Sequence, residues 1–259
     1  MLDAFYALPL WELALVIFAG FLLLAACVDL LLGLLQPTRV GRAATGLTNN
    51  THQLVATLTA LVMAFLASSV WTDGNEARNA VRSEARALRQ AVELSVKLPP
   101  PVRDDFLAAA QTYVDAIITQ EWPAMVAGSS SPVVRGERMR MVGIVAEADI
   151  ADERDTSLHR WMMDALDHAA EARARRLDLA GHGITPIKWL VVIVLATVTL
   201  LTVGFCHIDK PGARRIALTL YATAVSAMVF LIYSHDRPFT GEIQVDPAPL
   251  LRAVQAPGV

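Results

Sequence analysis

One face of an uncharged stretch, residues 51–71, carries side chains suited to contact ions or water inside a membrane. On a helical wheel, small and polar residues align there against a background of Leu, Val, Met and Phe. This stripe consists of Asn50, Gln53, Thr57, Ala60, Ala64 and Ser68. Hydroxyls and small residues can line a pore formed by several subunits. They also let membrane helices pack closely, so both interpretations stand.

Two other sets of side chains could perform chemistry. Asp29 lies toward the end of an apolar run, where a carboxylate is costly unless it is paired or near water. Its side chain is expected either to face the membrane interface or a neighbouring helix, or to lie in a functional cavity. Asp164, His168 and Glu171 have the spacing of a divalent-metal site. Such a trio is more often a solvated helix surface, so no metal is predicted.

The sequence offers little support for other functions. It contains no nucleophile beside a base, no phosphate loop and no Cys/His cluster, so neither an enzyme nor a cofactor is predicted. Cys27 and Cys206 both lie in apolar runs, which argues against a disulfide framework. The net charge of -3 gives no reason to expect nucleic acid as a partner.

Four apolar runs are long enough to position these residues in a bilayer. Hydrophobic residues make up 54% of the 259 residues, too many for an ordinary soluble protein. A helical span needs about 20 apolar residues, and the runs that qualify are residues 13–35, 51–71, 187–206 and 216–234. The fold class predicted is an all-α membrane protein, with four transmembrane helices as two hairpins and a helical bundle between spans two and three. The expected partner is therefore the lipid bilayer.

The division of the chain follows from these runs. The predicted parts are residues 1–50 (first span and polar loop), 51–72 (second span), 73–183 (soluble helical bundle), 184–234 (third and fourth spans) and 235–259 (C-terminal tail).

The bundle is predicted from apolar residues repeating at three and four positions. Four helices are expected, at about 76–98, 102–127, from 132 onward, and 152–180. The first and last should grow directly out of spans two and three. On the first, Glu84 should form local ion pairs with nearby arginines. On the last, Trp161 should belong to the buried stripe, while Arg173, Arg175 and Arg176 should complement the helix dipole and meet lipid phosphates.

The second pair of spans carries further signals. Lys188 and Trp189 open the third span, as a snorkelling cation beside an interfacial ring. A short connection, residues 208–215, makes spans three and four a hairpin. A charged and rigid segment then follows the fourth span: His235, Asp236, Arg237, Pro238, Phe239, Thr240, Gly241 and Glu242.

The loop charges predict an orientation. Arg39, Arg42, Lys210, Arg214 and Arg215 lie in the two short connections, whereas the N-terminal tail has no Lys or Arg. The positive-inside rule then places these connections in the cytoplasm and the bundle outside.

Several motifs resemble one family. Val70-Trp71-Thr72, Glu84-Ala85, the segment Glu121-Trp122-Pro123-Ala124-Met125, Lys188-Trp189 and especially the segment from His235 to Glu242 are similar to the bacterial bestrophin-like membrane proteins, a domain of unknown function. The likeness covers nearly the whole chain. It implies a four-span protein of the bacterial inner membrane with a helical insert between spans two and three.

The resemblance also suggests kinship to bestrophins, which are pentameric anion channels with the second span lining the pore and the helical domain in the cytoplasm. The leading hypothesis is therefore a homo-oligomeric ion channel or ion-permeable pore, lined by the stripe, with Asp236 and Arg237 stabilising the assembly or gate. The second span departs from the bestrophin pattern, because it lacks the aromatic constriction and Phe65 stands alone on a face otherwise small or polar. The alternative is a non-conducting scaffold or sensor whose bundle docks a partner.

Overall fold

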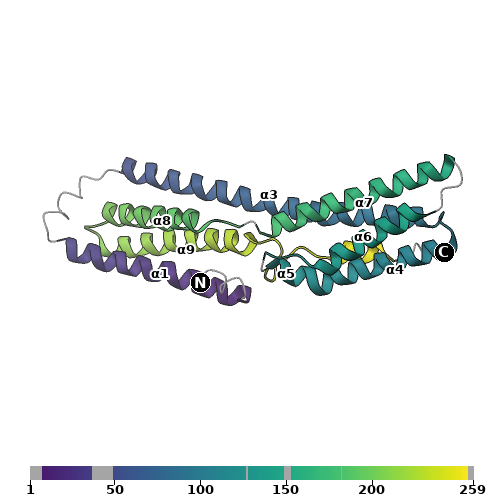
Figure 1. The fold of residues 1–259 in the computed structure, drawn as a ribbon. Coiled ribbons are helices and arrows are strands. Elements are labelled where there is room, and N and C mark those ends of the chain that lie inside the picture. The colour runs from purple at the N-terminus through teal and green to yellow at the C-terminus, as the bar shows by residue number, and fades with distance from the viewer. Residues whose placement is uncertain (1–7, 37–48, 127, 149–152, 182, 256–259) are drawn as a thin grey trace. The chain divides into compact units, whose positions relative to one another are not determined.

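The computed structural model describes residues 8–36, 49–126, 128–148, 153–181 and 183–255, and these form helices and connecting loops (Figure 1). They divide into two compact units. The first contains residues up to 72, residues 183–237 and residues 241–243; the second contains residues 73–182, 238–240 and 244–259. The division falls inside one helix, α3 (Asn49–Ser95), which continues from the second span into the insert, as predicted.

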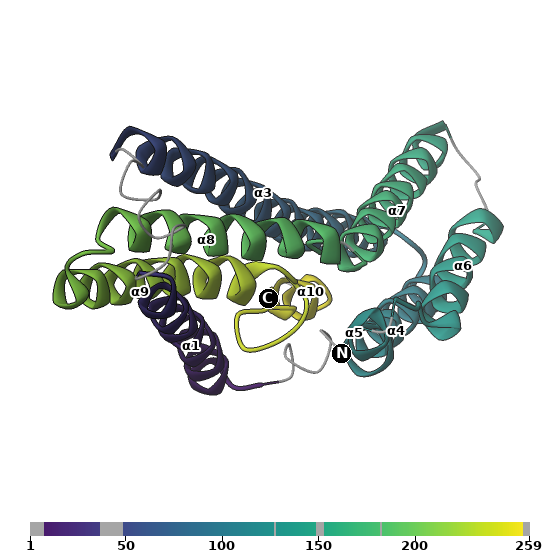
Figure 2. The same cartoon turned by 90° about the vertical axis from the view of Figure 1, so that its left-hand side faces the viewer.

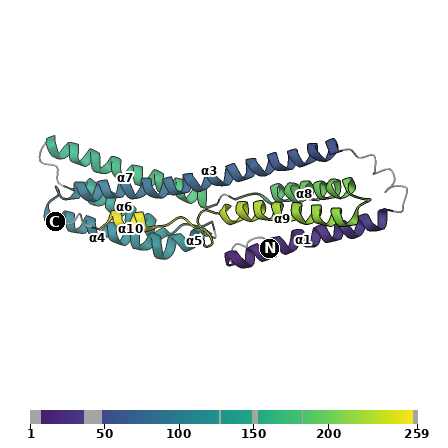
Figure 3. The ribbon, with the colours of Figure 1, turned by 180° about the vertical axis from the view of Figure 1, so that it is seen from behind.

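The first unit holds the four helices that are long and apolar enough to cross a membrane. They are α1 (Leu10–Leu35), the first part of α3, α8 (Pro186–Cys206) and α9 (Pro211–His235). Figures 1 and 3 show α8 beside α9, with α1 along α9. The four predicted spans are thus confirmed as apolar helices. Most of the polar connection predicted before α3 lies outside the described residues.

The helices α8 and α9 both begin earlier than predicted, each at a proline. Proline is favoured in the first helical turn, where its missing N–H is not needed, and both α8 and α9 begin with one. As a result α9 already contains Arg214 and Arg215, which were expected in a loop. The last helix of the insert is α7 (Glu153–Ala180), and five residues separate its end from Pro186. The expectation that it grows directly into the third span is therefore wrong.

Gly204 allows α8 to pass close to α1. A Cβ at this position would lie 2.2 Å from Cδ1 of Leu32, a side chain that is fully buried. Small residues commonly permit such close approach between membrane helices.

Replacing Gly204 with alanine should therefore destabilise the first unit, by about 1–3 kcal/mol, because Leu32 must leave its packed position. Thermal unfolding in detergent measures this. Gly20→Ala is the matched control, because nothing lies within 4 Å of the added Cβ. Equal midpoints for the two variants would contradict the close packing.

The second unit is a packed group of helices. The helices that follow α3 are α4 (Pro100–Ala116), the π-helical turn η2 (Ile117–Glu121), α5 (Trp122–Val126), α6 (Pro132–Glu147) and α7. Figure 2 shows α4 alongside α6. Their core includes Leu88, Phe106 and Met162. Trp161 was expected in this core, but it is 54% exposed.

The C-terminal segment contributes to the same core. After the motif that follows α9, the chain forms a short helix, α10 (Ala248–Ala253), which packs against α4. Val245, Leu250 and Ala253 are buried in the core cluster. Residues 244–255 are thus a structural part of the second unit, because these apolar side chains are removed from water there.

Candidate ion-path face and polar networks of the two units

The predicted stripe lies on the exposed side of α3. Gln53, Thr57, Ala60, Ala64 and Ser68 are all exposed; the side chain of Asn50 lies outside the described part of the structure. The face of α3 that packs inside the first unit is a different one, formed by Thr59, Met63, Leu66 and Val70. The stripe is therefore not used to pack the helices of its own unit.

The exposed side of α3 is itself divided by chemistry. Leu54, Leu58, Leu61 and Phe65 are exposed as well. Consecutive residues are about 100° apart around a helix, so these large side chains lie about a quarter turn from the stripe. Phe65, expected on the small and polar face, lies among the leucines instead, so that placement is wrong. The face with the leucines and Phe65 thus suits contact with lipid acyl chains. The stripe suits close helix packing or contact with water.

Hydroxyl groups join α3 to α8 on the buried side. The Oγ1 atoms of Thr59 and Thr199 lie 2.8 Å apart, and both residues are buried. Nδ1 of His52 lies 3.4 Å from Oγ1 of Thr202. Hydrogen bonds between membrane helices typically contribute about 0.6–2 kcal/mol each. These contacts fix which side of α3 faces α8. The stripe therefore lies on the exposed side of α3.

Asp29 binds the start of α9. Its Oδ1 accepts a hydrogen bond from Nε of Arg214 at 2.6 Å, and its Oδ2 accepts one from Nε of Arg215 at 3.1 Å. Arg214 is buried, and its Nη1 also donates to the carbonyl of Ile208. Of the two predicted placements, the structure thus favours a neighbouring helix. A carboxylate paired in this way stabilises the packing of α1 on α9.

The segment that follows α9 is anchored at two points within the first unit. Asp236 is buried, and its Oδ1 accepts the backbone N–H of Ile184 at 2.7 Å. The ring of His235 lies 6.1 Å from that of Trp71. Trp189 is buried, and its ring is tilted against that of Tyr233, with ring centroids 5.5 Å apart. Lys188 beside it is exposed.

The next residues of the motif belong to the second unit or turn the chain. Pro238 accepts the backbone N–H of Val245 at 2.7 Å, which closes a loop. Gly241 has φ +83°, a conformation that favours glycine, which explains the glycine of the motif. Glu242 is exposed. Phe239 is buried and meets Trp122 edge to face, with ring centroids 5.4 Å apart.

Glu84 and Glu121, separate in sequence, meet in the interior of the second unit. Arg176 lies between them. Its Nε donates to Oε2 of Glu84 at 2.7 Å, and its Nη2 donates to Oε1 of Glu121 at 2.9 Å. Arg173 forms a two-pronged pair with Glu121. All four side chains are buried, so two carboxylates are neutralised by two guanidinium groups.

Neutral groups complete this buried network. Tyr113 donates its hydroxyl to Oε1 of Glu84 at 2.8 Å, and the backbone N–H of Ser131 donates to Oε2 of Glu121 at 3.2 Å. Arg176 also lies 5.5 Å from the ring of Trp122, where a cation over an aromatic face is stabilised. Since Trp122 touches Phe239, the segment from Glu121 to Met125 and the motif from His235 to Glu242 come together here.

This network corrects two predictions. Glu84 does not form exposed pairs with arginines of its own helix, and Arg173 and Arg176 do not face lipid phosphates. Only Arg175 of that arginine group is exposed. Asp164, His168 and Glu171, which have the spacing of a metal site but were expected on a solvated surface, lie on the exposed side of α7.

The surroundings set the protonation of the network. Burial by itself raises the pKa of Glu121, but hydrogen bonds and charges from Arg173 and Arg176 together lower it below the ordinary value of 4.5. Burial, with the Glu84 carboxylate beside it, raises the pKa of Tyr113 well above 10. The phenol thus stays protonated as a donor while Glu121 stays ionised.

Glu121 should make stability depend on acid pH. Because its pKa is lower in the folded state, its contribution is fully present above about pH 4.5 and is lost as the pH falls through the folded value. Unfolding midpoints measured between neutral and acid pH should fall less steeply for Glu121→Gln than for wild type. Exposed Glu93→Gln is the control and should keep the wild-type slope. An unchanged slope in Glu121→Gln would contradict this assignment.

Together these features define an integral membrane protein with four apolar helices and a helical insert between the second and third. A family model described as Bestrophin-like domain matches residues 16–250. The chain belongs to the Bestrophin-like family, as the motifs suggested.

Solved structures share this fold. Two are variants of a bacterial bestrophin homologue from Klebsiella pneumoniae. One is 14% identical with a TM-score of 0.70 and covers 92% of this chain and 97% of that chain. The other is 14% identical with a TM-score of 0.70 and covers 93% and 95%. A third, described as a membrane protein, is 13% identical with a TM-score of 0.69 and covers 92% and 95%. None of the curated proteins matches the chain significantly.

Proposed function

We propose that this protein is a homo-oligomeric ion channel whose path is lined by the stripe on α3. The observation that carries the proposal is the position of Gln53, Thr57, Ala60, Ala64 and Ser68, exposed and distinct from both the packed face and the leucine face. One helix cannot enclose a path, so several copies must bring their stripes around an axis. The family membership supports a channel, since the solved relatives are named bestrophin homologues.

The stripe provides a path without fixed charge. Small side chains leave room at its centre, around Ala60 and Ala64, while hydroxyl and amide groups lie toward both ends. Uncharged polar groups replace part of the hydration shell of an ion without binding it tightly, which conduction requires. The juxtamembrane Asp236 and Arg237 would then stabilise the assembly or its gate.

The orientation of Thr57 suggests which ions pass. Its hydroxyl donates to the backbone carbonyl of Gln53 at 2.7 Å, so the hydrogen is occupied and the oxygen lone pairs remain as acceptors. Acceptor oxygens are ligands for cations rather than anions. We therefore expect cations to pass more readily than chloride.

Reconstitution tests the proposal. The protein purified in mild detergent should have the mass of an oligomer, and liposomes that contain it should release potassium faster than chloride. Monomers without ion flux would overturn the channel and favour the alternative, a non-conducting scaffold or sensor whose helical unit docks a partner. Flux with chloride preferred would retain the channel and overturn the cation assignment.

The orientation in the bacterial inner membrane is a separate proposal. The positive-inside rule places the connection at residues 207–210 in the cytoplasm and the insert outside, whereas the bestrophin resemblance implies the opposite. Labelling of single cysteines at exposed Arg135 of the insert and at exposed Lys210 in intact cells distinguishes them. Labelling at position 135 alone supports the charge rule, and labelling at 210 alone overturns it.

A further inference from the structure

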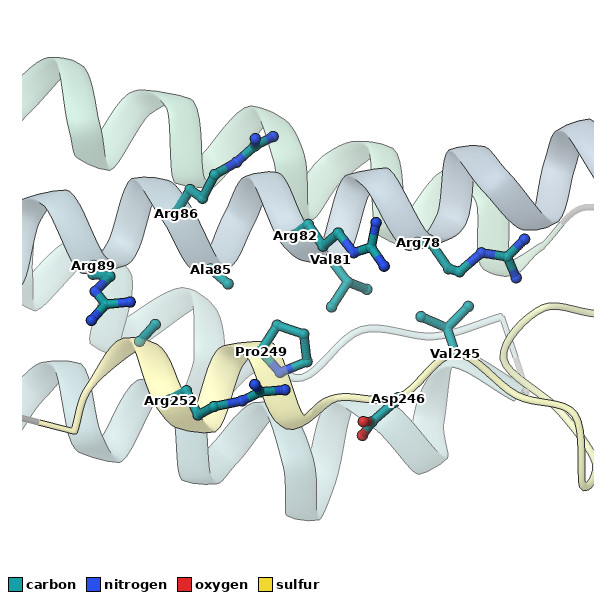
Figure 4. Close-up of a pocket in the computed structure, with 11 residues that line it drawn as sticks. Arg78, Val81, Arg82, Ala85, Arg86, Arg89, Val245, Asp246, Pro249 and Arg252 are labelled. Atoms are coloured by element: carbon teal, nitrogen blue, oxygen red, sulfur yellow. The ribbon is translucent and has the colours of Figure 1, made fainter.

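A groove in the second unit is lined by five arginines. It has a volume of about 530 Å³ and lies between α3 and the C-terminal segment. The arginines that line it are Arg78, Arg82, Arg86, Arg89 and Arg252. Its floor is apolar and includes Val81, Val245 and Pro249. Figure 4 shows this arrangement.

Four of these five arginines form no ion pair within the described residues. Across the described residues, Arg89 is the one member with an ion pair, to Glu93 at 3.2 Å. Arg78 and Arg252 donate to neutral oxygens, of Asn75 and Ala248 respectively. Asp246 is the single acidic side chain in the lining, and it accepts the backbone N–H of Ala248. Positive charge therefore exceeds negative charge in the groove.

This concentration of charge is unfavourable without a ligand. Arg78, Arg82 and Arg86 are spaced four residues apart, and like charges at that spacing destabilise a helix. In Figure 4, Arg86 points away from the C-terminal segment, whereas Arg78, Arg82 and Arg89 lie along the side of α3 nearer to it. Arg252 approaches from the opposite wall. Cations from two chain segments can thus reach one bound anion.

We propose that this groove binds a phosphate-bearing polyanion. Guanidinium groups match phosphate oxygens in geometry and charge, and two or more can share one phosphate group. Arg82 and Arg252 are the central ligands, because they lie on opposite walls and neither is ion-paired. The ligand is either a soluble phosphate compound or the headgroup of an anionic lipid. The site is separate from the stripe, and binding does not depend on conduction.

Binding of two probes tests the proposal on the full-length protein. Inorganic pyrophosphate represents a soluble compound, and short-chain phosphatidic acid represents a lipid headgroup. At least one probe should raise the thermal unfolding midpoint of wild type above that in sodium chloride of equal ionic strength. Arg82→Gln with Arg252→Gln should weaken that binding at least about tenfold, since charged hydrogen bonds are lost. Both side chains are exposed, so the variant should fold.

Arg135→Gln is the matched control, an exposed arginine on α6 outside the groove. It should bind the probe as wild type does. A response to pyrophosphate assigns a soluble ligand, and a response to phosphatidic acid alone assigns a headgroup. No response to either probe, or equal binding by the double variant and wild type, would overturn the site.

Discussion

Replacing Arg176 with methionine should lower the free energy of unfolding by about 3–5 kcal/mol, the typical cost of breaking a buried ion pair by removing one partner. Arg176 is fully buried and donates to both Glu84 and Glu121. Methionine fills much of the same volume but offers no charge. Glu84 would then keep only Tyr113 as a hydrogen-bond donor among the contacts described, and Glu121 would keep Arg173 and Ser131.

Urea unfolding in detergent measures this effect. The neighbouring Arg175 is exposed, so Arg175→Met is a matched control and should stay within about 0.5 kcal/mol of wild type. Adding Glu84→Met to Arg176→Met should recover part of the loss, because the uncompensated carboxylate is then removed. Equal stability of the Arg175 and Arg176 variants would show that the buried network contributes nothing measurable.

Replacing Ala60 with phenylalanine should reduce ion flux by at least about tenfold if α3 lines the path, since a hydrophobic side chain in a narrow pore excludes water and ions. Ala60 is exposed in the middle of the stripe. In a path surrounded by several copies, one substitution places a ring from every subunit at the same level. The number of rings that obstruct the path therefore equals the number of subunits.

Leu61→Phe is the matched control for this substitution. Leu61 is 50% exposed and lies on the leucine face, about 100° around the helix from Ala60. Its flux should stay within about twofold of wild type, because one large apolar side chain replaces another against lipid. The flux assay should be run at equal protein incorporation. A strong loss in Leu61→Phe with none in Ala60→Phe would place the path on the other face.

The membrane helices could be predicted because their signal is local. About 20 consecutive apolar residues identify a span whatever it packs against, and all four runs form such helices. The side of α3 that carries the stripe could also be found by periodicity. The residues of α8 that pack against the other side of α3 could not be predicted, because they depend on contacts between helices far apart in the chain.

The buried ion network could not be predicted from spacing, because its partners are far apart in the chain. Glu84 and Arg176 are separated by 92 residues, so the arginines one turn away from Glu84 were the natural expectation. One signal was present: Glu84 lies three residues after Val81 and four before Leu88, on the apolar face of its helix. A charged residue in such a position needs a buried partner.

The π-helical turn Ile117–Glu121 determines which changes in length this part of the chain can accept. Such a turn holds one more residue than an α-helical turn, as though a single residue had been inserted into α4. The wide turn takes up this extra residue, so Glu121 and Trp122 keep the phase of a regular helix one residue shorter, whereas one further inserted residue would rotate everything after it by about 100°. Glu121 would then turn away from Arg173 and Arg176, and Trp122 away from Phe239. This segment therefore tolerates the loss of one residue before Glu121 better than the gain of one.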